Sequence, residues 1–209
     1  MTDTLLTICS ANICRSPLAV AVLEHALTAQ GLNHRITLRS RGMDVDEGQR
    51  FCELALQVAR SNGVWTKLAD SHRATALEPR DLYAAELILA ADRSVRSRVI
   101  KLDPRAGERT FTFREAAALA RLVAVDDQDR PHDLSGFAAA LNDNRGLIDL
   151  PALERPSSLP WHRLRLHAYD VPDAHLDPHI SHRVVYRTLV PAVQELAGHL
   201  TAFASAGQR

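Results

Sequence analysis

The chain has 209 residues and a mass of 23.1 kDa, enough for one sizeable α/β core and tight for a second. Hydrophobic residues make up 46% and charged residues 24%, which excludes disordered, collagen-like and coiled-coil chains. Lys+Arg and Asp+Glu both number 25, so the net charge of zero implies neither nucleic-acid binding nor attraction to a membrane surface. No apolar run approaches ~20 residues and no signal-peptide pattern opens the chain, which predicts a cytoplasmic protein.

Strand and helix patterns alternate along the chain. A β-rich run at Thr4–Ile8 predicts a buried strand, and Ser16-Pro17 predicts the N-cap and first residue of a helix that ends at Gly31. Further strands are expected at 35–41, 86–90 and 109–113, and further helices at 49–61, 79–83, 94–102, 114–122, 134–141 and 181–203. This alternation predicts an α/β fold, with a doubly wound, mostly four-stranded parallel sheet and helices on both faces.

Residues 126–160 interrupt the alternation. The segment is rich in Asp, Asn and Pro and contains one helical pattern. We therefore expect a single domain over residues 1–209 that carries an insertion or a helical lid at about 126–160.

The segment from Cys9 to Ser16 reads CSANICRS and joins the first strand to the first helix. Unpaired N–H groups and the helix dipole make such a place favourable for an anion, and a loop of N–H groups can cradle a phosphate. Arg15 can hold two phosphate oxygens at once, and the same field favours the thiolate of Cys9 as a phosphorus nucleophile. Ser16 can donate a hydrogen bond to that sulfur. The residues expected to line the phosphate are Ser10, Ala11, Asn12, Ile13, Cys14 and Arg15.

The other two cysteines have less definite roles. Cys14 is either a small core residue or a redox partner that forms a disulfide with Cys9 and protects it from over-oxidation. Cys52 lies inside the second helix pattern and is expected to be core. Three cysteines argue against a disulfide framework, and none has zinc-ligand spacing in the sequence, so we expect neither a metal nor a cofactor.

The motif CSANICRSP, placed after a first strand, resembles the phosphate loop of the low-molecular-weight protein tyrosine phosphatases. Ser40-Arg41-Gly42 resembles the family's Ser-Ala-Gly, and His72-Arg73-Ala74 resembles its His-x-(Ala/Ser) segment. The run RTFTFRE at 109–115 is similar to bacterial members with an enlarged C-terminal half. The superfamily also contains the thioredoxin-coupled arsenate reductases.

The resemblance implies roles for single residues. Cys9 matches the nucleophile, Arg15 the phosphate clamp and Ser16 the serine that assists the thiolate. Asn12 matches an asparagine that holds the shape of the loop. Ala11 stands where many members have glycine, so the backbone there must accept a Cβ atom.

A phosphatase of this kind also needs an acid for the leaving oxygen, which the family carries in an Asp-Pro dipeptide before the last helix. Asp173 has the spacing of compact members to Tyr186, whereas Asp177 precedes a proline, and Asp170 is a third candidate. We expect Asp173, with Asp177 as the alternative. The aromatic wall for a phosphotyrosine ring is not evident, because Ala174, His175 and Leu176 follow Asp173. His175 and His179 could contact the substrate.

Three functions fit these residues. The first is a phosphomonoester hydrolase acting through a cysteinyl-phosphate on a phosphotyrosine protein or a small phosphate ester. The second is an arsenate reductase. Residues 78–103 lack the relay cysteines of the thioredoxin-coupled form, whereas a form resolved by a small-molecule thiol would need only Cys9. The third is a non-catalytic module that binds phosphate or phosphoproteins. The phosphatase is favoured, because binding alone does not require a thiol. The sequence gives no indication of oligomeric state.

Overall fold

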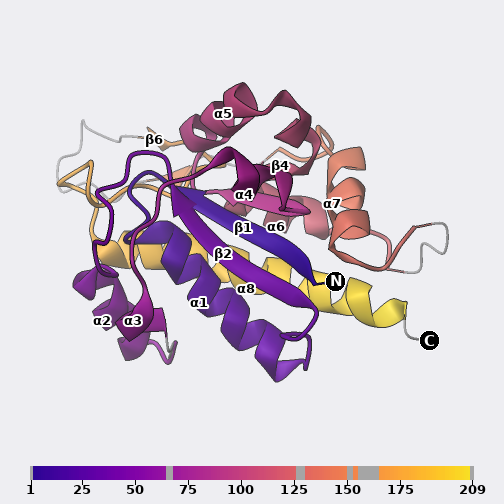
Figure 1. The fold of residues 1–209 in the computed structure, drawn as a ribbon, viewed down its shortest axis with the longest axis horizontal. Coiled ribbons are helices and arrows are strands. Elements are labelled where there is room, and N and C mark those ends of the chain that lie inside the picture. The colour runs from indigo at the N-terminus through magenta and orange to yellow at the C-terminus, as the bar shows by residue number, and fades with distance from the viewer. Residues whose placement is uncertain (1, 65–67, 126–129, 150–152, 155–164, 208–209) are drawn as a thin grey trace.

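Four parallel strands form the centre of the fold in the computed structural model, which describes residues 2–64, 68–125, 130–149, 153–154 and 165–207 (Figure 1). The strands are β1 (Asp3–Cys9), β2 (Ile36–Gly42), β3 (Leu87–Ala90) and β4 (Thr110–Thr112). Their order is β2-β1-β3-β4, so β1 lies between two strands that come later in the chain. The predicted doubly wound parallel sheet is therefore confirmed, with β1 at the point where the winding changes direction.

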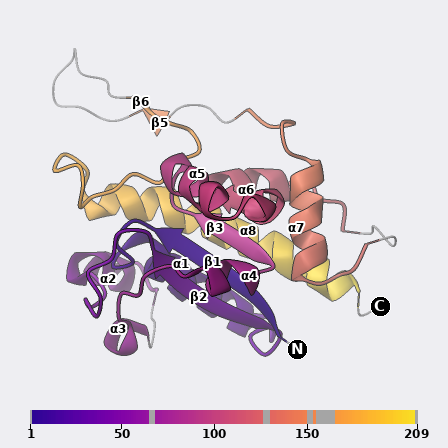
Figure 2. The same cartoon turned by 45° about the horizontal axis from the view of Figure 1, so that its top comes forward.

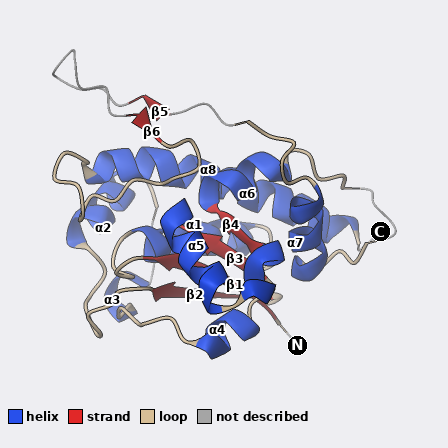
Figure 3. Ribbon diagram, turned by 90° about the horizontal axis from the view of Figure 1, so that it is seen from above, coloured by secondary structure: helices blue, strands red, loops and turns tan. Residues whose placement is uncertain are grey.

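Helices cover both faces of this sheet (Figure 3). The bounds of the helices around the main sheet are α1 Arg15–Ala29, α2 Glu53–Ser61, α3 Leu68–Ser71, α4 Pro79–Tyr83, α5 Arg93–Leu102, the 3₁₀ helix η1 Pro104–Arg109, α6 Phe113–Ala120, α7 Leu134–Asp143 and α8 His182–Ala206. Side chains of β1 point alternately to the two faces, as in any strand. Leu5 packs with α1, α6 and α8, whereas Leu6 and Ile8 pack with α4, α5 and η1.

Helix α8 packs along α1 and α6 on one face of the sheet (Figure 1). Six of its apolar side chains recur at helical spacing and are almost completely buried: Val185, Leu189, Val193, Leu196, Leu200 and Phe203. Burial of each such side chain contributes about 1.5–3 kcal/mol, so this stripe anchors the C-terminal segment. None of the described helices, α8 included, is long and apolar enough to cross a membrane.

Two helix starts differ from the sequence prediction by two residues or more. Helix α1 begins at Arg15 with Cys14 as its N-cap, so Ser16 is not the cap. Helix α2 begins at Glu53 rather than at 49, and its N-cap is Cys52. The interpretation of Cys52 as a core residue inside this helix is therefore wrong. Its thiol is half-buried at the N-terminus of α2 and lies 3.2 Å from His182 Nε2 at the start of α8.

The segment at 126–160 contributes one element to the core. Helix α7 occupies the predicted place and packs against η1 and α8, and its Leu134 N–H donates to Asp3 at the start of β1. A short antiparallel pair, β5 (Leu153–Glu154) and β6 (Arg165–Leu166), was not predicted and lies apart from the main sheet (Figure 2). Of this segment, residues 126–129, 150–152 and 155–160 lie outside the described residues, and the insertion or lid stays a prediction.

Candidate active site

The predicted phosphate loop lies at the carboxyl edge of the sheet, between β1 and α1. Cys9 ends β1 and pairs with Gly42 at the end of β2, and Asp92 follows the end of β3. The chain passes from β1 to β2 on one side of the sheet and later to β3 and β4 on the other side. The loops that follow β1 and β3 therefore lead away from each other and leave a space between them. Such a switch point is where open α/β sheets bind ligands.

The thiol of Cys9 is buried beneath this loop, with 3% of its surface exposed. Its Sγ lies 3.1 Å from Ser16 Oγ and accepts the backbone N–H of Asn12 at 3.3 Å. Asn12 Nδ2 donates to Ser16 Oγ at 2.9 Å, which occupies one lone pair of the hydroxyl. The hydroxyl of Ser16 can give its proton to the sulfur or to the Arg41 carbonyl, whose oxygen lies 3.4 Å away.

Asn12 holds a backbone conformation that few side chains tolerate. Its φ is +55°, in the left-handed region, where asparagine is among the favoured non-glycine residues. The side-chain oxygen accepts the backbone N–H of Thr75 at 2.9 Å, while its nitrogen donates to Ser16. Asn12 therefore fixes the loop both through its own backbone and through links to two other segments.

Donors from outside the loop hold its carbonyl groups. Three are backbone N–H groups and the fourth is the imidazole of His72, which lies in the segment after α3. The bonds are Met43 N to Cys9 O at 3.1 Å, Asp44 N to Ser10 O at 2.9 Å, Cys52 N to Ile13 O at 2.7 Å and His72 Nε2 to Asn12 O at 2.6 Å. Burial lowers the pKa of His72, although the bond to Asn12 acts in the opposite direction. The lowered pKa favours the neutral form of the ring.

Gly42 allows β2 to approach the loop closely. A Cβ atom at this position would lie 2.7 Å from Ser10 O and 2.9 Å from Asn12 N. Only glycine fits at these distances without displacing the loop. The Ser40-Arg41-Gly42 and His72-Arg73-Ala74 segments both lie against the loop, the first through Gly42 and the second through the bond from His72 to Asn12 O. Gly42 N–H also donates to the Thr75 carbonyl at 3.0 Å, which joins the two segments.

Arg15 is 2% exposed and joins the loop to the two other edges of the site. Its Nη1 donates to Asp92 Oδ2 at 2.8 Å and to the Val171 carbonyl at 3.0 Å. Its Nη2 donates to Ser10 Oγ at 3.3 Å and to Asp173 Oδ2. Burial lowers the pKa of Arg15, but the nearby Cys9, Asp173 and Asp92 outweigh it and raise the pKa, so the guanidinium stays charged.

The three candidate acids lie in different surroundings. Asp173 reaches Arg15 with one oxygen, and its other oxygen accepts the His175 N–H at 2.9 Å. Asp170 instead accepts from the backbone and side chain of Arg93. Asp177 accepts the N–H of His179 at 2.9 Å. Asp173 is thus the candidate whose carboxylate contacts the predicted phosphate clamp.

Asp92 is a site residue that sequence reasoning missed. It is the N-cap of α5, where Oδ1 accepts the Val95 N–H at 2.8 Å and Oδ2 accepts from Arg15. The available signal was an aspartate two residues after a strand that neighbours β1. Its carboxylate fixes the orientation of the guanidinium.

The thiols of Cys14, at the end of the loop, and Cys52, at the start of α2, interact with each other. The hydrogen bond between them and burial both raise the pKa of Cys14. The same hydrogen bond lowers the pKa of Cys52 to about 4, although burial of Cys52 acts in the opposite direction. The N–H of Ala55 and the imidazoles of His182 and His175 further favour the Cys52 thiolate. Cys9, Cys14 and Cys52 are all free thiols. The predicted redox role of Cys14 toward Cys9 stays a prediction.

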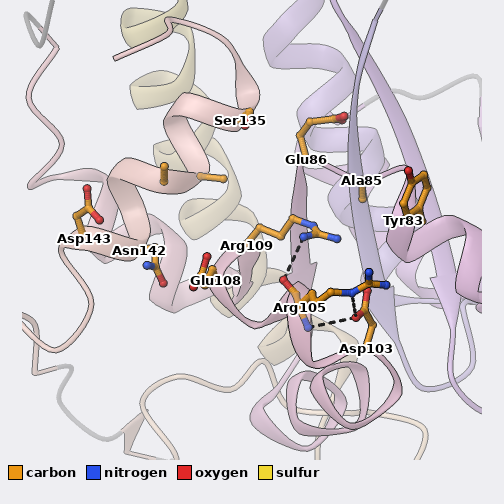
Figure 4. Close-up of a pocket in the computed structure, with 12 residues that line it drawn as sticks. Tyr83, Ala85, Glu86, Asp103, Arg105, Glu108, Arg109, Ser135, Asn142 and Asp143 are labelled. Atoms are coloured by element: carbon orange, nitrogen blue, oxygen red, sulfur yellow. Dashed lines mark hydrogen bonds and ion pairs between the residues drawn. The ribbon is translucent and has the colours of Figure 1, made fainter. Parts of the chain in front are cut away.

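An open pocket of about 610 Å³ lies at the opposite edge of the sheet (Figure 4). Glu86, which precedes β3, and Arg109, which precedes β4, help to line it together with Tyr83 and Asp103. None of the residues from Cys9 to Ser16 takes part. This pocket is therefore separate from the phosphate loop.

Comparisons with known proteins agree with this site. The family model for low molecular weight phosphotyrosine protein phosphatases matches residues 4–138. A protein-arginine-phosphatase of Geobacillus stearothermophilus is 26% identical over 149 residues, which cover 69% of this chain and 90% of that protein. A low molecular weight phosphotyrosine protein phosphatase of Schizosaccharomyces pombe is 32% identical over 125 residues, or 58% of this chain and 78% of that protein.

Solved structures show the same fold. YfkJ of Bacillus subtilis superposes with a TM-score of 0.63 at 18% identity, over 95% of this chain and 94% of that one. A protein tyrosine phosphatase of Entamoeba histolytica superposes with a TM-score of 0.64 at 15% identity, over the whole of both chains. With the family model matching well over half of the sequence, the chain belongs to the low molecular weight phosphotyrosine protein phosphatase family and is a cysteine-based phosphatase.

Proposed function

We propose that this enzyme hydrolyses phosphate monoesters through a cysteinyl-phosphate on Cys9, with Arg15 clamping the phosphate, Asp173 acting as general acid and Ser16 assisting the thiolate. The observation that carries the proposal is the position of Arg15. Its guanidinium links the loop above Cys9 to the carboxylate of Asp173. A phosphate held by this guanidinium would have the nucleophile on one side and the acid on the other.

The first step forms a sulfur–phosphorus bond and breaks the phosphorus–oxygen bond of the ester. The thiolate of Cys9 attacks phosphorus, and protonated Asp173 gives its proton to the leaving oxygen. Negative charge on the equatorial oxygens is held by Arg15 and the loop N–H groups, which are worth more in a buried site than in water.

The second step returns the enzyme to its starting state. Water attacks phosphorus, Asp173 accepts a proton from that water, and the sulfur–phosphorus bond breaks. The leaving group is now the thiolate of Cys9. The hydroxyl of Ser16 at 3.1 Å and the N–H of Asn12 at 3.3 Å support its charge as it leaves.

We further propose phosphotyrosine in proteins or a small phosphate ester as the substrate, hydrolysed by one domain in the cytoplasm. The family supports phosphotyrosine, and a nucleophile that must remain a free thiol suits a reducing compartment. The protein-arginine-phosphatase among the relatives makes phosphoarginine a necessary comparison.

The test is a substrate panel with a trapping experiment. Purified protein is assayed with p-nitrophenyl phosphate, phosphotyrosine, phosphoserine and phosphoarginine peptides, and arsenate with thiol reductants. We expect phosphotyrosine hydrolysis, and a rapidly quenched reaction should carry phosphate on the peptide that contains Cys9. Cys9→Ser should lose turnover while it retains phosphate binding. Turnover near the wild-type rate in this variant, or arsenate reduction in place of ester hydrolysis, would overturn the proposal.

The acid is tested separately by the leaving group. Asp173→Asn should slow phenyl phosphate by the ~10²–10⁴-fold that a general acid contributes, and slow p-nitrophenyl phosphate much less, because nitrophenolate leaves without a proton. Asp177→Asn is the matched control in the same loop and should keep the wild-type dependence. If the two variants exchange these results, Asp177 is the acid.

A further inference from the structure

Four side chains that the proposed phosphatase mechanism does not use meet at the end of the loop where α1 begins. They are the thiols of Cys14 and Cys52 and the imidazoles of His175 and His182, and their ligand atoms all lie within 4.8 Å of one another. Cys14 is the N-cap of α1, Cys52 is the N-cap of α2 and His182 is the first residue of α8. His175 comes from the loop that carries Asp173, so the cluster joins four separate segments.

The spacing of the cluster fits a tetrahedral metal ion. Cys52 Sγ lies 3.2 Å from His182 Nε2, and His182 Nε2 lies 3.4 Å from His175 Nε2. Zinc bound at ~2.3 Å to sulfur and ~2.0–2.1 Å to nitrogen sets tetrahedral edges of about 3.4 Å between two nitrogens and about 3.6 Å between sulfur and nitrogen. These two separations are within a few tenths of an ångström of such edges, and every other pair of ligand atoms lies within 4.8 Å.

The chemistry and access of the cluster also suit zinc. Two thiolates and two imidazoles form one of the ligand sets of structural zinc sites, and two thiolates balance the charge of a divalent ion. Cys14 is 4% exposed, Cys52 and His182 are half-buried, and His175 is exposed. The site is therefore closed on the protein side and open to solvent at one ligand, which gives an ion a way in.

We propose that Cys14, Cys52, His175 and His182 bind a zinc ion. The ion would connect the starts of α1, α2 and α8 to the loop that bears Asp173. Because the N–H of His175 donates to Asp173 Oδ1, a metal on His175 would also hold that carboxylate in place. This site is separate from the phosphate contacts of Cys9 and Arg15, and it stands or falls independently of the proposed phosphatase mechanism.

The test uses the full chain with cobalt as a spectroscopic probe. Reduced, metal-free protein titrated with Co²⁺ should bind one ion and develop the visible bands of tetrahedral cobalt together with a thiolate-to-cobalt band in the near ultraviolet. Cys52→Ser should reduce the thiolate band by about half, because Cys14 remains a thiolate ligand. His175→Ala should weaken Co²⁺ binding by ~10²-fold or more, at least as much as the loss of an outer-shell partner. His175 is exposed, so this variant should fold normally.

Two control variants locate the metal. His179→Ala changes an exposed histidine of the same loop that is not in the cluster, and it should bind Co²⁺ like the wild type. Cys9→Ser should also keep both bands, because the catalytic thiol is not a ligand. Zn²⁺ should displace Co²⁺ and raise the melting temperature of the wild type, but not of His175→Ala.

Three results would overturn the zinc site. One is the absence of tetrahedral cobalt bands in the reduced wild-type protein. Another is unchanged binding in both Cys52→Ser and His175→Ala. The third is loss of the thiolate band in Cys9→Ser, which would place the metal on the nucleophile.

Discussion

The guanidinium of Arg15 donates to the carboxylate of Asp173, a residue 158 positions further along the chain. This pairing puts the proposed acid against the group that should bind the phosphate. A phosphate dianion at Arg15 and an ionised Asp173 repel each other, so phosphate binding competes with the ion pair between Arg15 and Asp173.

Removal of the Asp173 charge should therefore strengthen oxyanion binding. We expect Asp173→Asn to bind inorganic phosphate or vanadate on the order of tenfold more tightly, equivalent to about 1.4 kcal/mol, while it turns over esters more slowly. Isothermal titration calorimetry measures the affinity. Asp177→Asn controls for loss of a carboxylate in the same loop, and equal or weaker binding in Asp173→Asn would argue against the competition.

Arg15→Lys should lose most activity although the positive charge remains. A lysine ammonium is a point charge that cannot donate to Asp92, Ser10 and two phosphate oxygens from one planar group. We expect kcat/KM to fall on the order of 10²-fold or more, as for the loss of a preorganised donor. Arg93→Lys, which changes a neighbouring arginine that pairs with Asp170, is the comparison. Similar kinetics for both variants would remove Arg15 from the phosphate.

Gly42→Ala should damage the loop without touching any reactive group. The added Cβ would lie far too close to Ser10 O and Asn12 N, so the loop must shift. A displacement near 1 Å costs about 10²-fold in rate, which steady-state kinetics with p-nitrophenyl phosphate would detect. Gly107→Ala is the control, because there the nearest heavy atom is 4.0 Å away. Wild-type kinetics in Gly42→Ala would show that the loop has room to adjust.

Two substitutions at Asn12 should distinguish the backbone contribution to loop stability from the side-chain contribution. Asn12→Ala loses the bonds to Ser16 and Thr75 and also strains the positive φ, which together should cost about 2–3 kcal/mol. Asn12→Gly loses the same bonds but tolerates that φ, so it should be more stable than the alanine variant by about 1 kcal/mol. Urea unfolding measures both. If alanine is as stable as glycine, the backbone conformation is not what asparagine provides.

His72 should make the stability of the protein depend on acidity. Its pKa is lowered in the folded state, so the unfolded chain binds more protons below the ordinary value of 6.5. Folding stability is then complete above that pH and falls as the pH drops toward the lowered pKa. Urea unfolding between about pH 5 and pH 7.5 should show a smaller loss for His72→Gln, which keeps a donor toward Asn12 O but does not titrate. Equal slopes would exclude His72 as the source.

Local signals in the sequence predicted much of this arrangement. A β-rich run, a Ser-Pro pair and a glycine placed β1, the loop and α1 to within about two residues, because each signal acts within a few neighbouring residues. The prediction of Ser16 as the N-cap was wrong, because a local signal does not show which distant or neighbouring groups a side chain will bond. Serine caps helices often, but here its hydroxyl is used by Cys9 and Asn12, and the helix starts at Arg15.

Residues that act across long sequence separations could not be predicted in the same way. Asp92 lies 77 positions from Arg15, and Cys52 lies 130 positions from His182. Zinc-ligand spacing is recognisable only when ligands occur in close pairs, whereas each ligand of the cluster proposed here comes from a different segment. Only the packing of α1, α2 and α8 brings those side chains together.

The outward anchoring of the loop carbonyls determines where its N–H groups point. In a trans peptide the N–H of one residue lies opposite the C=O of the residue before it. Carbonyls of Cys9, Ser10, Asn12 and Ile13 that are bonded to outside donors therefore turn the N–H groups of the following residues, Ser10, Ala11, Ile13 and Cys14, toward the loop interior. The donors are oriented by the fold itself, so a bound oxyanion should find its cradle already in place and move the backbone very little.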